Sequence, residues 1–240
     1  TREMWGWIFL ERFTQDLRYA VRQLKKTPGF ATVVIVTLAL GIGVNSSLFT
    51  VTNAVLLKML PVHNPQQLVL IGVVNPKRAE PAFAMPYPAY EQIRDHNEVF
   101  SSVLAYADDD LTADFENIAD RVHAQLISGS FFRTLGIQTI LGRPILSSDD
   151  NGGAMPVAVI STHFWQQHFS GVPDVVGRIL RLNGVPFTIV GVLNARFIGV
   201  ELGSSPDVYV PISLQPRLNP GSRQLQVSTT WWLHIIGRLR

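Results

Sequence analysis

An uninterrupted apolar stretch near the N-terminus constrains this chain more than any other feature. No ionisable side chain lies between Lys26 and Lys58, and residues 30–57 form a run of 28 mostly apolar residues. A helix of that length would measure about 42 Å, whereas the hydrocarbon core of a bilayer is about 30 Å thick. A core helix of a soluble protein is rarely so long without a charge, and the apolar part of a cleaved signal peptide is about half as long. We therefore expect a transmembrane helix over residues 28–58, with length to spare for a tilt or a short stalk.

The charges beside this stretch predict its orientation. Four basic residues lie close before it, and Lys58 is the single basic residue directly after it. Because basic flanks remain cytoplasmic, we expect the N-terminus in the cytoplasm of a bacterial cell, the helix in the inner membrane, and residues 59–240 in the periplasm.

The segment 1–27 has an amphipathic pattern. Apolar residues recur at helical spacing over residues 13–24 with basic residues on the opposite face, and Pro28-Gly29 separates this pattern from the apolar run. This predicts a cytoplasmic helix lying on the membrane surface; a helix packed on another subunit is the alternative. The cations expected to contact lipid head groups are Arg18, Arg22, Lys25 and Lys26.

Small and polar side chains recur along one side of the predicted membrane helix. In lipid, helices associate through close backbone approach and interhelical hydrogen bonds, and such a stripe permits both. We therefore expect this helix to pack against other membrane helices, although a lone anchor is the alternative. The predicted packing residues are Ala39, Gly43, Asn45, Ser47, Thr50, Asn53 and Ala54.

Beyond residue 59 the pattern changes to short apolar runs separated by Gly, Pro and Asn. Strands are expected over residues 68–74, 121–127, 156–160, 178–182, 185–193, 207–212 and 232–239, with Asn183-Gly184 as a hairpin turn. Helices are expected over residues 87–96, from Ser128 or Ser130 to Leu135, and over 162–169 after a capping Ser161. Residues 75–86 and 213–229 are expected to be surface loops or subdomain junctions. This mixture predicts an α+β extracytoplasmic domain of short strands and helices.

Composition excludes several kinds of site. The chain contains no cysteine, which excludes disulfides, thiolate metal sites and cysteine nucleophiles. Its formal net charge is only +2, which does not favour nucleic-acid binding. The acidic stretch 108–116 lacks the glycine that a calcium loop needs, so we expect it to be a solvated loop. His163 and His168 fall on different faces of one helix, which is poor geometry for joint metal binding.

Motifs of enzymes are also missing from the sequence. It has no G-x-x-x-x-G-K-[ST], G-x-S-x-G or H-E-x-x-H. ATP hydrolysis, if it takes part in the function, must therefore occur on another polypeptide. We expect no catalytic residue, no cofactor and no metal ligand in this chain, and we expect the aromatic residues Phe131, Phe132, Phe164, Trp165 and Phe169 to form core.

Several consecutive blocks resemble the MacB/FtsX-type ABC transporter permeases, most closely the acidobacterial-type orphan permeases with a MacB-like periplasmic core domain. The blocks are DLRYAVRQLKKTPGFATVVIVTLALGIGVNSSLFTVTNAVLL (residues 16–57), SGSFFRTLGIQTILGRPI (128–145), PVAVISTHFWQQHF (156–169), VVGRILRLNGVPFTIVGV (175–192) and SPDVYVPI (205–212). The resemblance implies a first membrane helix, a large periplasmic domain and three further helices, so that this chain would be a fragment whose domain, residues 59–240, is incomplete at its C-terminus.

The resemblance also implies a function and partners. The chain would be a permease subunit that couples ATP hydrolysis on a separate ABC ATPase to the export or extrusion of an extracytoplasmic substrate. Its partners would be that ATPase, other permease helices or a second permease copy, the lipid bilayer and, in some systems, a periplasmic adaptor. The alternative is an extracytoplasmic sensor or binding domain on a single anchor; an anchored hydrolase is disfavoured because the nucleophile motifs are missing.

Overall fold

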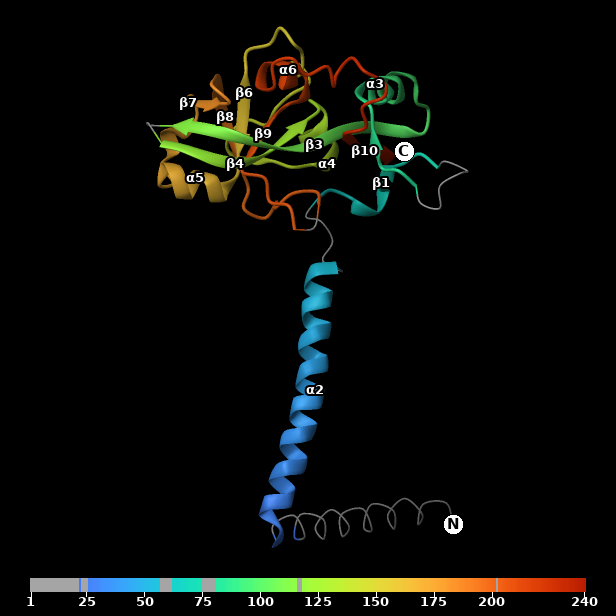
Figure 1. Ribbon diagram of the computed structural model, residues 1–240, viewed down its shortest axis with the longest axis vertical. Helices are drawn as coiled ribbons and strands as arrows, with labels where there is room; N and C mark the ends of the chain where they lie inside the picture. The colour runs from blue at the N-terminus through green and yellow to red at the C-terminus, as the bar shows by residue number, and fades with distance from the viewer. Residues whose placement is uncertain (1–21, 23–25, 57–61, 75–80, 116–117, 202) are drawn as a thin grey trace, which may run out of the picture. The chain divides into compact units, whose positions relative to one another are not determined.

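The computed structural model describes residues 22, 26–56, 62–74, 81–115, 118–201 and 203–240, with the backbone alone for residues 48–56 and 118. The chain divides into two compact units, Thr1–Lys58 and Met59–Arg240 (Figure 1). We call the second unit the outer domain and describe each unit by itself.

The first unit contains one long helix, α2 (Pro28–Leu56), of 29 residues. Its first backbone hydrogen bond runs from the Ala31 N–H to the Thr27 carbonyl at 3.1 Å. Inside the helix, the hydroxyl of Thr37 donates to the Val33 carbonyl at 2.8 Å. Such bonds satisfy a polar side chain without water, so this threonine is compatible with an apolar surrounding. The predicted amphipathic helix within 1–27 lies outside the described residues, apart from Arg22 and Lys26, which are helical.

The outer domain mixes strands and short helices, which confirms the predicted α+β class. Its strands are β1 (Leu68–Ile71), β2 (Ala84–Met85), β3 (Phe100–Phe115), β4 (Ile118–Ile127), β5 (Thr139–Gly142), β6 (Val157–Ile160), β7 (Ile179–Leu182), β8 (Val185–Leu193), β9 (Val208–Pro211) and β10 (Leu233–Leu239). Its helices are α3 (Tyr87–His96), α4 (Phe131–Leu135), α5 (Thr162–Phe169) and α6 (Gln215–Leu218), with 3₁₀ turns η1 (Pro65–Gln67), η2 (Pro173–Val175) and η3 (Ile212–Leu214).

Six of the strands close into a ring. The sheet order is β1-β10-β3-β4-β9-β6-β8-β5, and β7 pairs with both β8 and β3. Pairing therefore runs from β3 through β4, β9, β6, β8 and β7 back to β3, where Ala113 faces Leu182. The β4–β9 and β6–β8 pairs are parallel and the other four are antiparallel. The β3–β7 and β6–β9 contacts are short, with two residue pairs each, so the ring closes over only part of the length of its strands.

Two buried clusters fill the outer domain. The first core takes residues from all six ring strands, so it lies inside the ring, and it includes Leu111, Leu126, Ile160, Leu180, Phe187 and Val208. The second core contains Tyr106, Ile127, Phe131, Phe132, Leu135, Val159, Phe197 and Tyr209. Strand β9 contributes to both cores, because successive side chains of a strand point to opposite faces. Val208 and Val210 belong to the first core, and Tyr209 between them belongs to the second. Figure 1 shows α5 and α6 on opposite sides of these strands.

Several local predictions are confirmed. Helix α3 has the predicted bounds, with Pro88 in its first turn, and the Ser161 hydroxyl accepts the Phe164 N–H at 3.1 Å as the cap of α5. The β7–β8 turn has positive φ at Asn183 (47°) and Gly184 (80°), as a type I′ turn requires. Of the predicted core aromatics, Phe131, Phe132, Phe164 and Phe169 are buried and Trp165 packs against the first core while half-buried.

The prediction of a solvated acidic loop at residues 108–116 is wrong. Residues 108–115 belong to β3, a strand of 16 residues that pairs with β4. The neighbouring strand supplies donors that the local sequence does not reveal: the side chain of Gln125 donates to Asp108 at 2.7 Å, and Arg121 pairs with Asp110 at 3.0 Å. A hydrogen bond from His123 and the charge of Arg121 also hold the pKa of Asp110 below its ordinary value.

Smaller corrections concern element ends. Ser130 precedes α4 but makes no side-chain cap, because its hydroxyl donates to the Val103 carbonyl at 2.7 Å; the Ser128 hydroxyl accepts the Ala105 N–H instead. The predicted strand 68–74 ends at Ile71, and the expected loop 75–86 contains β2.

Candidate functional site

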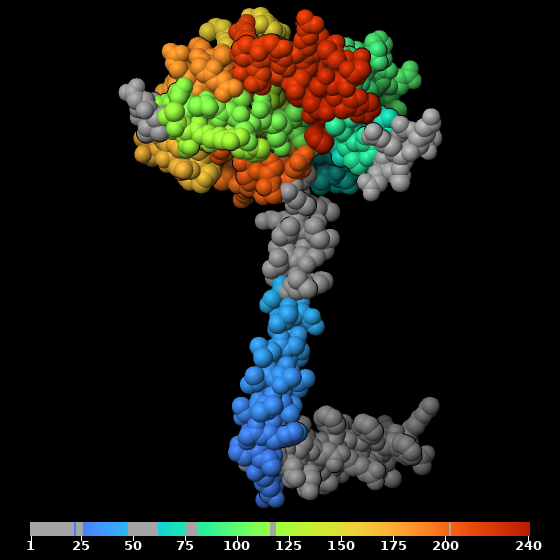
Figure 2. Space-filling view, viewed as in Figure 1, coloured from blue at the N-terminus to red at the C-terminus, as the bar shows by residue number. Residues whose placement is uncertain are grey.

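Most described side chains of α2 are apolar and exposed, with Ala31 as a buried exception; the described part of this helix is blue in Figure 2. Phe30, Leu40 and Ile42 are 73%, 63% and 65% exposed. Among the described residues, Pro28–Ser47 forms one helix long and apolar enough to cross a membrane. An exposed apolar surface of this extent is costly in water and favourable in lipid or against neighbouring helices.

The predicted packing stripe has open space beside it. Ala39, Gly43, Asn45 and Ser47 are exposed, and a Cβ added at Gly43 would meet nothing within 4 Å. Thr50, Asn53 and Ala54 belong to α2, but their side chains lie outside the described residues. The role of the stripe in packing stays a prediction.

The basic cluster is only partly described. Arg22 and Lys26 are exposed, whereas Arg18 and Lys25 fall outside the described residues. Their contact with lipid head groups stays a prediction.

The segment that leads into β1, residues 62–67, is anchored to the outer domain; we call it the entry segment. Val62 at its start packs against the second core, and so does Leu68, the first residue of β1, which follows it directly. The His63 N–H donates to the Leu135 carbonyl at 2.9 Å, at the carboxyl end of α4. The entry segment is thus attached by both backbone and side chains.

Arg238 of β10 reinforces this attachment with its whole guanidinium group. Its Nε and Nη2 donate to the Thr134 carbonyl at 3.0 and 2.8 Å, and Nη1 donates to the Asn64 carbonyl at 3.2 Å and to Gln67 Oε1 at 3.1 Å. A further bond runs from Nη2 to the His63 carbonyl. A guanidinium has five N–H donors, so these five bonds use its full capacity. Bonds of this kind are charge-assisted and therefore stronger than those between neutral groups.

The local geometry of α4 explains why this arginine is needed. The last carbonyls of a helix lack partners inside the helix and carry partial negative charge, so a cation is favourable there. Helix α4 ends at Gly136, whose φ of 71° is left-handed. A Cβ at Gly136 would also lie 2.7 Å from His63 Cβ. Glycine is therefore required both by the backbone and by the close approach of the entry segment.

Two strands that are far apart in the sequence lie side by side in the outer domain. β1 pairs with β10 in antiparallel register, and Leu68 faces Arg238. The strand that follows the entry segment is thus paired with the strand that carries Arg238.

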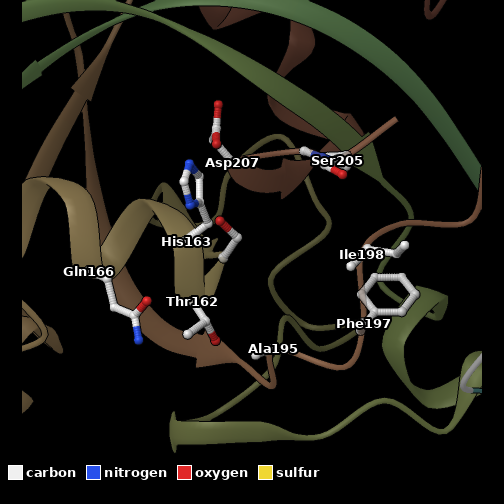
Figure 3. Close-up of a pocket in the computed structure, with 10 residues that line it drawn as sticks. Thr162, His163, Gln166, Ala195, Phe197, Ile198, Ser205 and Asp207 are labelled. Carbon is white, nitrogen blue, oxygen red and sulfur yellow. The ribbon is translucent and has the colours of Figure 1, made fainter. Parts of the chain in front are cut away.

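A cavity of about 420 Å³ lies between the start of α5 and the segment 195–207 (Figure 3). Phe197, Ile198 and Pro206 give it apolar walls, and Phe197 is buried while Ile198 is 59% exposed. Polar groups come from His163, Gln166, Ser205 and Asp207. The cavity is thus a partly open recess with both apolar and polar lining.

Hydrogen bonds fix the two walls of this cavity. The Ser161 N–H donates to the Asp207 carbonyl at 2.8 Å, and the Thr162 hydroxyl donates to the Leu193 carbonyl. Asp207 is held in turn by β4, because its N–H donates to the His123 carbonyl at 2.7 Å. The cavity is therefore built on the ring of strands.

A second cavity, of about 270 Å³, is lined by α3, the start of β3 and the loop before α4. Its charged lining residues are Arg94, Arg133 and Asp150. Arg94 already pairs with Asp95 at 2.7 Å, and the carboxylate of Asp150 accepts the Gly129 and Ser213 N–H groups at 2.9 and 3.0 Å. Arg94 and Asp150 are thus already engaged in contacts within the outer domain.

Chemistry-bearing clusters are sparse. Within the described part of the chain, no group of three His, Cys, Asp or Glu side chains is placed to hold a metal ion. His163 lines the first cavity, whereas His168 packs against Phe115 and Phe164 with ring centroids 4.6 and 4.5 Å away.

Sequence reasoning did not find Arg238. Its bonding partners lie 104 to 175 positions earlier in the chain. The available signal was a charged residue inside an otherwise apolar strand, 232–239, and that signal does not say what the charge binds.

Comparisons with known proteins agree with this architecture. The model of the family described as the MacB-like periplasmic core domain matches residues 31–239. The macrolide export ATP-binding/permease protein MacB of Hahella chejuensis is 27% identical over 99 residues, which are 41% of this chain and 15% of that protein. The chain thus matches a small part of that curated relative.

Two solved structures share the fold. The periplasmic region of MacB from Actinobacillus actinomycetemcomitans superposes with a TM-score of 0.53 at 15% identity, covering 72% of this chain and 73% of that one. A domain of a protein assigned as a permease from Porphyromonas gingivalis gives a TM-score of 0.56 at 16% identity, covering 72% and 75%. At such identities the likeness concerns the fold alone.

Proposed function

This chain belongs to the family of the MacB-like periplasmic core domain, and from that premise we propose that it is the membrane-anchored outer part of an ABC transporter permease. The observation that carries the proposal is the extent of the family match, which begins inside α2 and runs to the end of β10. The apolar helix and the outer domain therefore belong to one family unit.

The helix supplies the membrane part of the proposed function. Its exposed apolar side chains over Pro28–Ser47 suit the lipid of the bacterial inner membrane, with the N-terminus in the cytoplasm. The stripe that includes Ala39 and Gly43 would contact other permease helices or a second permease copy. The outer domain would then lie in the periplasm.

The outer domain would act mechanically. The sequence lacks a phosphate-binding loop, so the energy would come from ATP hydrolysis on a partner ABC ATPase. Movement of the membrane helices would reach the domain through the entry segment, and the domain would extrude a substrate already outside the inner membrane. A periplasmic adaptor could extend the path.

We propose, from the family match, that the outer domain follows a first membrane helix of the permease. The pairing of Leu68 with Arg238 holds β1, the strand that comes directly after the entry segment, within this domain.

Site-directed labelling tests the topology. The chain contains no cysteine, so one introduced thiol gives an unambiguous signal. Ser228→Cys, at an exposed site of the outer domain, should react with a membrane-impermeant maleimide in intact spheroplasts. Thr14→Cys should react only after the membrane is permeabilised. The reverse pattern would reject the proposed orientation.

Purification tests the assembly. The tagged natural protein, extracted from its own membrane, should retain an ATPase with a G-x-x-x-x-G-K-[ST] motif, identified by mass spectrometry. Substituting the lysine of that motif should abolish the ATPase activity of the purified complex. Recovery of a kinase or cyclase in place of the ATPase would favour the alternative of a sensor on a single anchor.

A further inference from the structure

Helix α4 lies between the entry segment and the first cavity. Its carboxyl end binds the entry segment through the Leu135 and Thr134 carbonyls, which accept from His63 and Arg238. Its side chains belong to the second core, where Phe131 and Phe132 are almost fully buried. One short helix thus contacts both the point of chain entry and the interior.

An aromatic cluster continues from α4 to the cavity. The ring of Phe131 lies 6.4 Å from that of Phe197 at an interplanar angle of 73°. Tyr209 completes the cluster, with its ring 6.3 Å from Phe131 and 6.2 Å from Phe197. Phe197 is at the same time a wall of the cavity. Because protein interiors are close-packed, displacement of one ring displaces its neighbours.

We propose that α4 couples the position of the entry segment to the shape of the cavity lined by Phe197, with Arg238 as the residue that positions the segment on α4. The coupling goes beyond the proposed function, because it rests on contacts within the outer domain and holds whichever substrate the protein moves. Coupling between two sites is reciprocal. A ligand that fills the cavity would therefore restrain the entry segment.

Hydrogen exchange measured by mass spectrometry, on the full 240-residue chain in lipid nanodiscs, tests this coupling. Arg238→Gln removes most of the guanidinium bonds. We expect backbone amides of residues 62–67 and of the cavity wall, 195–206, to exchange about tenfold faster, which corresponds to about 1.4 kcal/mol. Residues of β7, whose buried side chains Leu180 and Leu182 belong to the first core, should be unchanged. Arg240→Gln, at an exposed arginine two positions further on, should leave all these rates unchanged.

A purely structural role for Arg238 would give a different pattern. Faster exchange limited to residues 62–67 and 134–136, with 195–206 unchanged, would overturn the proposal. In a Phe131→Leu background the proposal predicts that Arg238→Gln still accelerates 62–67 but no longer changes 195–206. An undiminished effect on 195–206 in that background would also count against α4 as the link.

A second variant displaces the entry segment in another way, and it keeps the test valid if Arg238→Gln unfolds the whole domain. If Arg238→Gln accelerates β7 as well, Gly136→Ala replaces it. Its Cβ would lie 2.7 Å from His63 Cβ at a residue whose φ is 71°, so the entry segment would be displaced from α4 without a substitution at Arg238. Faster exchange at 195–206 in Gly136→Ala supports the coupling, and unchanged exchange there rejects it.

Discussion

Asn183 holds Thr112 by two hydrogen bonds across the closure of the strand ring. The Asn183 N–H donates to the Thr112 carbonyl at 2.8 Å, and the Thr112 N–H donates to Asn183 Oδ1 at 2.9 Å. The same side chain donates from Nδ2 to the Leu218 carbonyl at 3.1 Å. A turn residue thus joins the β7–β8 hairpin to both β3 and α6.

Replacing this asparagine should therefore destabilise the outer domain. Asn183→Ala removes both side-chain bonds and places a Cβ-bearing residue without a polar group at a φ of 47°. We expect the free energy of unfolding of the full chain in detergent to fall by about 2 kcal/mol. Asn183→Gly also removes the side-chain bonds, but glycine adopts a positive φ without strain. Its free energy of unfolding should therefore fall by about 1 kcal/mol less than that of Asn183→Ala. Equal losses would show that the side-chain bonds dominate.

The contact between β5 and β8 requires glycine at residue 142. Its φ is 66°, and a Cβ there would lie 2.1 Å from the Val190 carbonyl oxygen. Gly142→Ala should lower the free energy of unfolding by about 2–4 kcal/mol, measured by urea denaturation of the full chain in detergent. Gly152→Ala is the matched control, because a Cβ at Gly152 meets nothing within 4 Å. A change at Gly152 as large as that at Gly142 would contradict the steric explanation.

Alkaline pH should weaken the outer domain through its buried tyrosines. Burial, with the charges of Asp150 and Glu91, raises the pKa of Tyr87 from 10.0 to about 12. Burial also raises the pKa of Tyr106 and Tyr209. Since the unfolded chain releases these protons first, the associated stability is complete below pH 10 and falls as the pH rises towards 12.

Tyr87→Phe isolates one of these contributions. The variant has no proton to release at this site, so its stability should fall less steeply between pH 10 and 12. Because Tyr87 is partly exposed, we expect the pH-dependent loss in the free energy of unfolding to differ by only about 1 kcal/mol between the unsubstituted chain and Tyr87→Phe near the upper end of this pH range. Urea denaturation of both proteins at pH 8 and pH 11 measures it. Parallel pH profiles would mean that Tyr87 does not contribute.

The stripe on α2 leads to a prediction about assembly. Gly43→Leu should reduce co-purification of the natural protein's partner helices, because a leucine blocks close approach of backbones in lipid. Gly41→Leu is a matched control on another side of the same helix, and a Cβ at either glycine meets nothing within 4 Å. If both variants retained equal amounts of the partner helices, the stripe would not be the surface that packs against them.

The basic flank leads to a prediction about orientation. Replacing Arg18, Arg22, Lys25 and Lys26 with Gln leaves Lys58 as the nearest basic residue, so a fraction of molecules should insert with the N-terminus outside. Maleimide labelling of Ser228→Cys in intact spheroplasts should fall accordingly. The same change at Arg2 and Arg12, further from the helix, should have a smaller effect. Unchanged labelling in the fourfold variant would show that this flank does not set the orientation.

Several elements could be predicted because their determinants are local. Helix α3 needs only the Pro88 start and its helical spacing, α5 needs the Ser161 cap, and the β7–β8 hairpin needs Asn183-Gly184. Each of these sequence signals determines the backbone conformation of residues that lie only a few positions away. Helix α2 could also be predicted locally, because its length and its lack of charged side chains are properties of one continuous segment.

Other features depend on neighbours that are distant in sequence. Asp108 and Asp110 indicated a loop when considered alone, yet they lie in a strand. Gln125 stands opposite Asp108 on β4, His123 stands opposite Asp110, and Arg121 of β4 reaches Asp110 with its side chain. The same holds for the cavity, whose walls come from α5 and the segment 195–207.

Hydrophobicity, turn residues and missing motifs can be recognised along the chain, and they were enough to predict the apolar helix, the α+β class and the lack of enzyme motifs. The closure of the ring, the position of the cavity and the binding of the entry segment to α4 by Arg238 became visible with the folded arrangement alone. The physical reason is that a hydrogen bond has a range of about 3 Å, so its partners are defined by position in space and can come from any part of the chain.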